Sequence, residues 1–524
     1  MPYGLNMSLR PNSSDYEGVF QRQEGRSADV PPEEEWLPSS RGKPAHDSSK
    51  TNTSAEMELN KDPTSNSTSL SSSLAEKWVP SRGHALSFVG LFLFSVILYF
   101  RPYELVPALS SFMSMAFYTG IITLAIFVPT QLGLEGNLTA RPREVNLILL
   151  LGLAALLSMP MAISPGEAWT TFNDNLIKAL VIFIVIVNVV RTERRLKLLI
   201  LLALVVSIYL SISAIYDYQQ GVFMVGSVET HDLRIVGRIK GLFENSNDLA
   251  LHLVTMVPLA VALGLAKPGL FRKLIFFGAT GLMIAAIIVT FSRGGFLGLL
   301  ASVFVLVHRL GRKNRLGTSG ALLFAIILFF GLAPGAYSGR ISTILDSSAD
   351  LTTSSSQRTD VFKRSVQVAL RYPLFGVGIG NFHYKSIREL ATHNAYTQVA
   401  AEMGLAAMII YIMFLVYPFK RLRMIEKQSY SERDHNQFYY LAIGMQASLA
   451  GYMVSSFFGA VAYQWYAYYL VGYAVCLHRI FLMRSQVGND LARRLWEQPF
   501  AKKRGSLVDR PAASQPRHGF ETAN

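Results

Sequence analysis

The stretch RRLKLLILLALVVSIYLSISAI, from Arg194 to Ile215, decides the class of fold. No charged side chain interrupts it between Leu198 and Ile215. As an α-helix, a run of this length can cross the roughly 30 Å hydrocarbon core of a bilayer. The basic residues at its start are typical of the cytoplasmic end of such a helix. The stretch therefore predicts a transmembrane helix that begins in the cytoplasm.

The composition of the whole chain also indicates a membrane protein. Its 524 residues are 51% hydrophobic and 16% charged, with a mean hydropathy of +0.30. Soluble domains carry roughly a quarter charged residues, so lipid is the expected solvent. A net charge of +14 would also suit nucleic-acid binding, but Lys and Arg gather in short runs between apolar segments, as membrane topology requires. The single cysteine, Cys476, excludes a disulfide framework and a Cys-rich metal site.

Apolar segments long enough to span a bilayer recur between two polar tails. They predict an all-α integral membrane protein with about twelve transmembrane helices. The first nine helices fall in residues 84–334 and the last three in residues 396–483. The expected spans are 84–100, 107–129, 145–163, 175–190, 198–215, 248–266, 274–291, 294–308, 320–334, 396–418, 437–458 and 463–483.

The basic residues assign an orientation to these spans. If the N-terminus is cytoplasmic, every second helix ends in the cytoplasm, and five basic runs then fall on that side. These runs are Arg141/Arg143, Arg191/Arg194/Arg195/Lys197, Lys267/Arg272/Lys273, Arg309/Arg312/Lys313/Arg315 and Lys420/Arg421/Arg423. Both termini are therefore predicted to be cytoplasmic.

Three segments outside the spans differ in composition. Residues 1–83 are rich in Ser, Asn, Pro and Glu and lack apolar periodicity, which predicts a disordered cytoplasmic tail. Residues 484–524 form a basic cytoplasmic tail that suits anionic headgroups, although a solvated disordered end has the same composition. Residues 335–395 become a large periplasmic loop. That loop contains an expected amphipathic helix from Arg358 to Leu370, with one apolar face made of Phe362, Val366, Ala369 and Leu370.

Four sequence patterns lie on the predicted outer side. The first runs from Gly237 to Asp248 and reads GRIKGLFENSND. Asn247 or Asp248 is the expected N-cap of the next helix, and Arg238 and Lys240 could attract an anion. A capped helix behind a solvated basic loop is the alternative interpretation.

The second and third patterns each contain an arginine. Ser292-Arg293-Gly-Gly295 is an expected tight hinge between two spans. Arg293 could snorkel to the interface, but an arginine at an outer membrane exit runs against the positive-inside bias and favours a functional role. In Ser356-Gln-Arg358-Thr-Asp360, the arginine opens the amphipathic helix, where a local pair with Asp360 is the alternative to a ligand contact.

The fourth pattern, THNAY from Thr392 to Tyr396, precedes a span that contains Glu402. A lone histidine at a helix start is usually structural. The positive end of the helix nevertheless disfavours protonation of His393, and a neutral imidazole is what a general base must be. The glycine-rich run before it, from Pro373 to Phe382, is expected to be a kinked turn, because no βαβ unit surrounds it as a dinucleotide site would require.

These patterns together indicate one chemistry. Arginines at the outer face suit a pyrophosphate, because guanidinium binds phosphate oxygens bidentately and keeps its charge. A neutral histidine nearby suits activation of a hydroxyl. No paired Asp or Glu residues with metal-ligand spacing occur in the outer segments of the sequence, so a scheme based on arginine, with no metal and no cofactor, is favoured.

The ordered set of motifs resembles the O-antigen ligase and polymerase superfamily. The resemblance covers roughly Leu105 to Arg479 and departs from the family in the long N-terminal tail and the short loop after Pro334. It implies a helical bundle in the bacterial inner membrane, an active site that faces the periplasm, and a donor glycan on undecaprenyl pyrophosphate. The motifs that carry it are Arg238-x-Lys-Gly-x-Phe with Asn247, Ser292-Arg293-Gly, Gln357-Arg358, Pro373-x-x-Gly-x-Gly, His393-Asn394-x-Tyr and Glu402-x-Gly.

The resemblance also implies roles for single residues. Arg293 and Arg358 match the arginines that hold the donor pyrophosphate, and His393 matches the proposed catalytic base. Asn394 and Tyr396 are candidates for orienting the base or lining the acceptor side. The remaining positions of the first motif, Arg238, Lys240, Asn245 and Asn247, are candidates for donor or structural support.

The acceptor stays open at this point. A lipid A-core sugar would make the chain an O-antigen ligase, which ranks first by resemblance. A growing glycan end would make it a polymerase, and a protein hydroxyl an O-oligosaccharyltransferase. A secondary transporter or lipid flippase is the alternative from another class, and it predicts charges at mid-membrane and broken helices in symmetry-related halves. Glu402 is a candidate deep charge, and no internal repeat is visible in the sequence.

Overall fold

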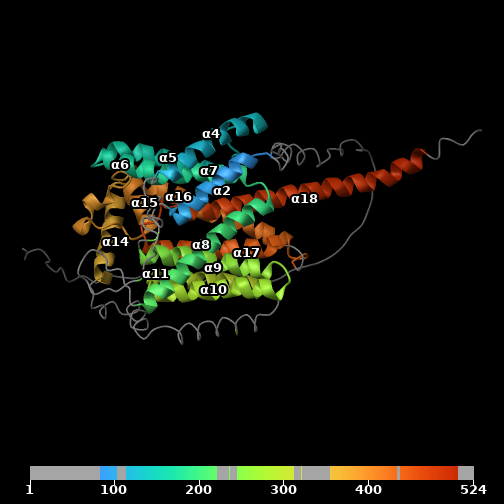
Figure 1. Ribbon diagram of the computed structural model, residues 1–524. Helices are drawn as coiled ribbons and strands as arrows, with labels where there is room; N and C mark the ends of the chain where they lie inside the picture. Colours follow the sequence, from blue (N-terminus) through green and yellow to red (C-terminus); the bar gives the residue numbers. More distant parts are fainter. Residues whose placement is uncertain are drawn as a thin grey trace, which may run out of the picture. The chain divides into compact units, whose positions relative to one another are not determined.

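The computed structural model describes residues 83–102, 114–220, 235, 243, 245–311, 320, 354–433 and 437–505. Every regular element in these ranges is a helix (Figure 1). The α-helices are α2 (Ala85–Phe100), α4 (Met115–Glu135), α5 (Arg143–Ser158), α6 (Pro165–Thr171), α7 (Ile177–Val189), α8 (Glu193–Gln219), α9 (Ser246–Leu265), α10 (Leu270–Val289), α11 (Arg293–Leu310), α14 (Ser354–Arg371), α15 (Ala395–Met403), α16 (Leu405–Gln428), α17 (Gln437–Ser455) and α18 (Trp465–Gly505). Short 3-10 or π turns adjoin several of them.

The expected all-helical membrane architecture is confirmed. Ten helical segments of the described residues are long and apolar enough to cross a membrane, and α2 is a shorter apolar helix. The predicted span 320–334 apart from residue 320, the tail 1–82 and most of the first half of the predicted loop 335–395 lie outside the described residues. The total of twelve spans therefore stays a prediction.

Several predicted boundaries differ from the observed helices. The span predicted at 107–129 is helical from Met115 to Glu135, and the span predicted at 175–190 begins at Pro165. The span predicted at 396–418 is two helices, because Gly404 adopts φ 90° between α15 and α16. At the C-terminus, α18 continues to Gly505 without a break at residue 484. Hydropathy locates the apolar part of a helix but not its polar ends.

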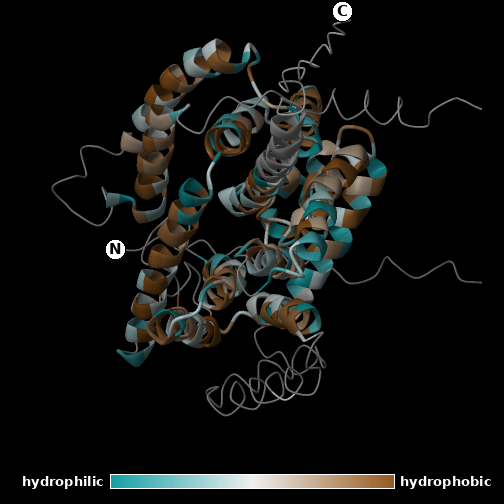
Figure 2. Cartoon of the chain, turned by 90° about the vertical axis from the view of Figure 1, so that its right-hand side faces the viewer, coloured by the Kyte–Doolittle hydropathy of each residue, from teal (hydrophilic) through white to brown (hydrophobic). Residues whose placement is uncertain are grey.

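The helices differ in how deeply they lie inside the bundle. In α9 and α18, 83% of the most apolar window is buried, whereas in α4 the share is 17%. Helix α17 packs against α9 and α11, and α18 packs against α7 and α16. Figure 2 shows apolar residues along the lengths of the helices and polar residues mainly near their ends. The outer helices thus present an apolar surface that suits lipid.

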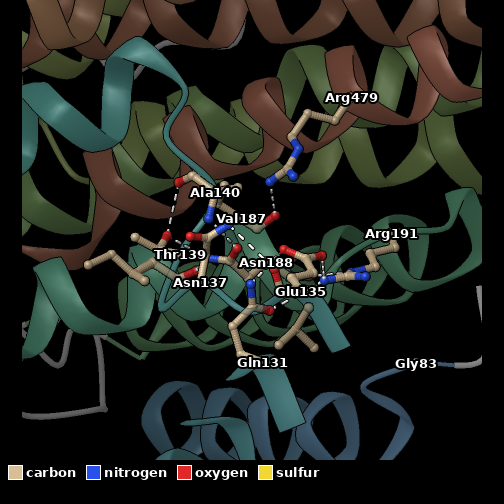
Figure 3. A network of polar contacts seen from close by, with 12 residues as sticks. Gly83, Gln131, Glu135, Asn137, Thr139, Ala140, Val187, Asn188, Arg191 and Arg479 are labelled. Atoms are coloured by element: carbon tan, nitrogen blue, oxygen red, sulfur yellow. Dashed lines mark hydrogen bonds and ion pairs between the residues drawn. The ribbon is translucent and has the colours of Figure 1, made fainter. Parts of the chain in front are cut away.

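A buried polar network ties together one end of the bundle (Figure 3). Arg191, just after α7, forms an ion pair with Glu135 at the end of α4. The side-chain oxygen of Asn188 accepts a hydrogen bond of 2.9 Å from the backbone N–H of Ala140. Arg479 of α18 donates to a backbone carbonyl of α7 over 2.9 Å. Buried charges need such partners, so these contacts join the ends of α4 and α7 and hold the end of α7 against α18.

Two further ion pairs extend this end of the bundle. Arg421 of α16 lies 3.0 Å from Glu144 at the start of α5, measured from Nε to Oε1. Arg309 near the end of α11 lies 3.4 Å from Glu426, measured from Nη1 to Oε2. The arginines come from the runs that the sequence assigns to the cytoplasm. The basic helix ends therefore gather on one side, as the predicted alternation of the spans requires.

Helix α14 contains the predicted amphipathic segment and packs through part of its apolar surface. Val361 and Val368 are buried in a small cluster of their own with Val377, Phe382 and Ala401. Of the four residues on the predicted apolar face, Ala369 is buried, whereas Phe362 and Leu370 are 37% and 66% exposed and present an apolar surface that suits lipid. The helix is turned toward the glycine-rich run and α15 because these two segments supply the apolar surface beside it.

Candidate functional site

The starts of α9 and α11 are joined through their capping side chains. Asn245 is the N-cap of α9, so the expectation of Asn247 or Asp248 was wrong by two or three positions. The Asn245 side chain accepts from the backbone N–H of Asn247 over 2.9 Å. Asn247 in turn accepts a 2.7 Å hydrogen bond from the hydroxyl of Ser292, the N-cap of α11. Two helix N-termini, each with a partial positive charge, therefore lie side by side.

Arg293 is the first residue of α11 and is half-buried. The hinge expected here is confirmed, because α10 ends at Val289. The two glycines after Arg293 allow close packing. A Cβ at Gly294 would lie 2.6 Å from the Cβ of Phe458, and a Cβ at Gly295 would lie equally near the Cβ of Ala250. Small residues thus bring the start of α11 against α9 and against the chain that follows α17.

The start of α15 has an unusual backbone at His393. Its φ of 50° lies in the left-handed region, which costs a residue other than glycine about 1 kcal/mol or more. Asn394 is the N-cap, and its side-chain oxygen accepts from the backbone N–H groups of Tyr396 at 2.9 Å and Thr397 at 3.0 Å. Capping is therefore the task of Asn394. His393, the residue before this cap, is half-buried.

Tyr396 connects α15 to the segment between α17 and α18. Its hydroxyl donates to the carbonyl of Met453 over 2.8 Å and accepts from Ser456 over 3.2 Å. Its ring centroid lies 5.6 Å from that of Phe457. The ring of Phe362 lies 6.2 Å from the same Phe457 ring, which brings α14 to this point. Arg358, half-buried, stands one helical turn before Phe362 on α14.

The α17–α18 connection, residues 456–464, is the element that sequence reasoning missed. The hydroxyl of Ser455, the last residue of α17, donates to the carbonyl of Gly294 over 3.1 Å. Together with the contacts of Phe457 and Phe458, this hydrogen bond makes one junction between α11, α14 and α15. The signal was present in the sequence, because the run from Ser455 to Gly459 interrupts two apolar spans with serine and glycine.

The glycine-rich run closes the other end of α15. Gly376, Gly378 and Gly380 all have positive φ, and a Cβ at Gly376 would lie 2.3 Å from the carbonyl carbon of Glu402. The backbone N–H of Gly378 donates to the carbonyl of Glu402 over 3.0 Å, and the N–H of Val377 donates to an adjacent α15 carbonyl over 2.9 Å. The run is therefore a kinked turn that satisfies the end of a helix, as predicted.

Glu402 lies at the end of α15, with its carboxylate held in place. The Oε2 atom accepts from the backbone N–H of Gly380 at 2.9 Å and from the hydroxyl of Tyr463 at 2.7 Å. Burial and the neighbouring Glu402 raise the pKa of Tyr463 well above its ordinary value, so its hydroxyl stays protonated and donates. A cavity of about 270 Å³ adjoins these groups, with Thr392 and Gln398 in its wall.

Two of the sequence-predicted residues cannot be located in this structure. Arg238 and Lys240 lie outside the described residues. Within the described ranges, no three His, Cys, Asp or Glu side chains gather as ligands of a metal ion would. The other predicted residues belong to two groups, Asn245, Asn247 and Arg293 at the starts of α9 and α11, and Arg358, His393, Asn394 and Tyr396 on α14 and α15.

Residues 278–412 match the family described as O-antigen ligase. This match supports membership of the O-antigen ligase superfamily. The matched segment contains Arg293, Arg358 and His393, and it runs from α10 into α16. No curated protein matches the chain. The match favours glycan transfer of the O-antigen ligase kind over the transporter and flippase alternatives.

Proposed function

We propose that the chain is an inverting glycosyltransferase of the bacterial inner membrane, most similar in function to an O-antigen ligase. It transfers a glycan from undecaprenyl pyrophosphate to an acceptor hydroxyl at the periplasmic face. The observation that carries this proposal is the junction at the α17–α18 connection, which joins α11, α14 and α15, the helices of Arg293, Arg358 and His393. This junction lies at the opposite helix ends from the buried ion pairs of the basic side.

The chemical step follows from the charges of these groups. Arg293 and Arg358 bind the donor pyrophosphate and offset the charge that grows as its bond to the anomeric carbon breaks. The acceptor oxygen forms the new bond to that carbon in line, and its proton passes to His393. The products are the transferred glycan and undecaprenyl pyrophosphate. Asn245 and Asn247 support the first arginine by fixing the start of α11 through Ser292.

A deletion strain tests the function directly. Loss of surface glycan together with accumulation of the full-length lipid-linked precursor is the expected result. An unchanged surface glycan would contradict the proposal. A polymerase would instead leave single repeat units on the lipid carrier, and a protein O-oligosaccharyltransferase would leave unmodified proteins.

The purified protein tests the arginine scheme. Because the donor already carries its leaving group, transfer should proceed without ATP and in the presence of EDTA. Activity that stops with EDTA and returns on addition of a divalent ion would show that a metal, and not arginine alone, stabilises the pyrophosphate.

A further inference from the structure

Helix α14 has a second apolar side besides the one that packs against the protein. The packed side contains Val361 and Val368. Phe362, Val366 and Leu370 follow the helix at intervals of four residues and therefore share another side of it. Phe362 is 37% exposed and Leu370 is 66% exposed, and Val366 is partly buried. This row of three residues is called the apolar stripe below.

Exposed apolar residues continue past the end of the helix. Leu374 comes one further interval of four after Leu370, and Leu374 and Phe375 are 73% and 41% exposed. Phe457 of the α17–α18 connection, whose ring lies 6.2 Å from that of Phe362, is itself 49% exposed. Contiguous exposed apolar residues of this kind mark a site of interaction with a protein or a membrane.

The remaining side of α14 is polar and basic. Lys363, Gln367 and Arg371 are exposed and also follow one another at intervals of four residues. Arg364 is held beside them, because its Nε atom donates to the carbonyl of Lys385 over 2.7 Å. Cations on the side predicted to be periplasmic run against the positive-inside bias and need a reason. An apolar stripe next to a basic side is typical of a helix that lies in the surface of an anionic bilayer.

The direction of α14 suits this partner. Figure 1 shows the helix at the end of the bundle away from the C-terminal extension of α18, where it runs across the direction of α9 and α10. Helices α9 and α10 are long and apolar enough to cross the membrane, so their axes follow the membrane normal to a first approximation. Helix α14 therefore runs along the plane of the membrane, as a helix in its surface must.

We propose that α14 lies in the surface of the outer leaflet of the membrane. The apolar stripe and Leu374 enter the boundary between headgroups and acyl chains, and Lys363 and Arg371 lie at the level of anionic phospholipid headgroups. A second step rests on the proposed function. Because the same helix carries Arg358, its contact with the leaflet positions that arginine at the depth where the pyrophosphate of a lipid-linked donor lies.

Quenching by lipid tests the contact in the full-length protein. A fluorophore is attached to Leu374→Cys, beyond the apolar stripe, or to Gln367→Cys, on the polar side. The native Cys476 is buried, so the wild-type protein gives the background. Each protein is reconstituted into vesicles of phosphatidylglycerol or of phosphatidylcholine that carry bromine on their acyl chains. Leu370→Glu disrupts the stripe of the Leu374→Cys protein, and Gln367→Glu places the same charge on its polar side as the matched control.

We expect brominated phosphatidylglycerol to quench the label at Leu374→Cys but not the label at Gln367→Cys. Quenching at Leu374→Cys should be lost with Leu370→Glu, retained with Gln367→Glu, and weaker in phosphatidylcholine, which carries no net charge. Absence of quenching at Leu374→Cys, or equal quenching at both labelled positions, would overturn the contact with the leaflet. Equal quenching in the two lipids would overturn the role of anionic headgroups.

Transfer by the unlabelled variants tests the link to Arg358. Leu370→Glu should raise the KM for the lipid-linked donor by about tenfold or more, because a displaced helix misplaces the arginine, and Gln367→Glu should leave it unchanged. Normal transfer by a Leu370→Glu protein that has lost the quenching would overturn this link. The expected quenching together with no transfer by the wild-type protein would instead contradict the proposed function and leave the contact with the leaflet standing.

Discussion

His393 is one of several residues other than glycine with a left-handed backbone. It holds a left-handed backbone conformation with φ 50°, and Asn394, not His393, caps the helix that follows. A strained residue with no capping task persists where the surrounding structure forces it, and such residues cluster at active sites. The strained backbone therefore supports a functional role for His393, independently of the sequence motif.

Replacing His393 should separate the chemical step from donor binding. We expect His393→Asn to lose transfer but to bind an undecaprenyl-pyrophosphate analogue within a few-fold of wild type. Asn tolerates the left-handed conformation, so this change removes the base without straining the backbone. His393→Ala should behave alike in transfer but unfold at a lower temperature. Single-turnover transfer and analogue binding distinguish these effects, and normal turnover by a folded His393→Asn protein would exclude the base.

Replacing Arg293 or Arg358 by lysine tests whether the planar guanidinium group is needed in addition to its positive charge. Arg293→Lys and Arg358→Lys keep a positive charge but lose the planar fork that binds phosphate bidentately. Loss of one transition-state donor typically costs about 10²–10³ in rate, so each variant should be nearly silent and bind the analogue more weakly. Arg371→Lys, at the exposed end of α14, is the matched control and should transfer normally. If Arg293→Lys and Arg358→Lys transferred glycan as fast as the control Arg371→Lys, neither arginine would make a bidentate contact with the donor.

Among the elements, the kinked turn from Gly376 to Gly380 has the strictest backbone demands. Gly376→Ala would place a Cβ 2.3 Å from the carbonyl carbon of Glu402 at a φ of 67°. We expect a loss of about 1–3 kcal/mol in stability, and a lower melting temperature in detergent. Gly133→Ala is the matched control, because nothing lies within 4 Å of its Cβ in α4, and alanine favours a helix. Its melting temperature should be unchanged or higher.

The sequence predicted the helices better than the contacts between them. Hydropathy located α9 and α11 to within a few residues, because an apolar run in lipid has few alternatives to a helix. It placed a single span across Gly404, since hydropathy does not register a positive φ. The sequence also left open which face of α14 packs against the protein. Packing against the glycine-rich run decides that face, and the periodicity of α14 alone cannot reveal it.

The site was predictable as a set of motifs but not as a junction. Arg293, Arg358 and His393 were singled out by the ordered set of motifs, and their roles stay predictions. The role of the α17–α18 connection depends on contacts between residues far apart in sequence, such as Ser455 with Gly294. A single sequence carries no signal for such contacts.

For the whole molecule, the distribution of charge predicts which helix ends face the cytoplasm and which face the periplasm. The ion pairs of Arg191, Arg421 and Arg309 gather one set of helix ends, and the positive-inside rule assigns such an end to the cytoplasm. The junction of the proposed site lies at the other ends and should face the periplasm. Orientation relative to the cell is therefore the property on which the periplasmic reaction depends.

Cysteine labelling measures this orientation. The only native cysteine, Cys476, is fully buried, so the wild-type protein gives the background. Gly378 is a poor labelling position, because a Cβ there would lie 2.5 Å from Ala162, whereas Tyr384 nearby is 46% exposed. Tyr384→Cys should react with a membrane-impermeant maleimide in intact cells with a permeabilised outer membrane. Lys427→Cys, exposed at the end of α16, should react only after lysis. Labelling in the reverse order would place the arginines and His393 in the cytoplasm and remove the periplasmic donor from the scheme.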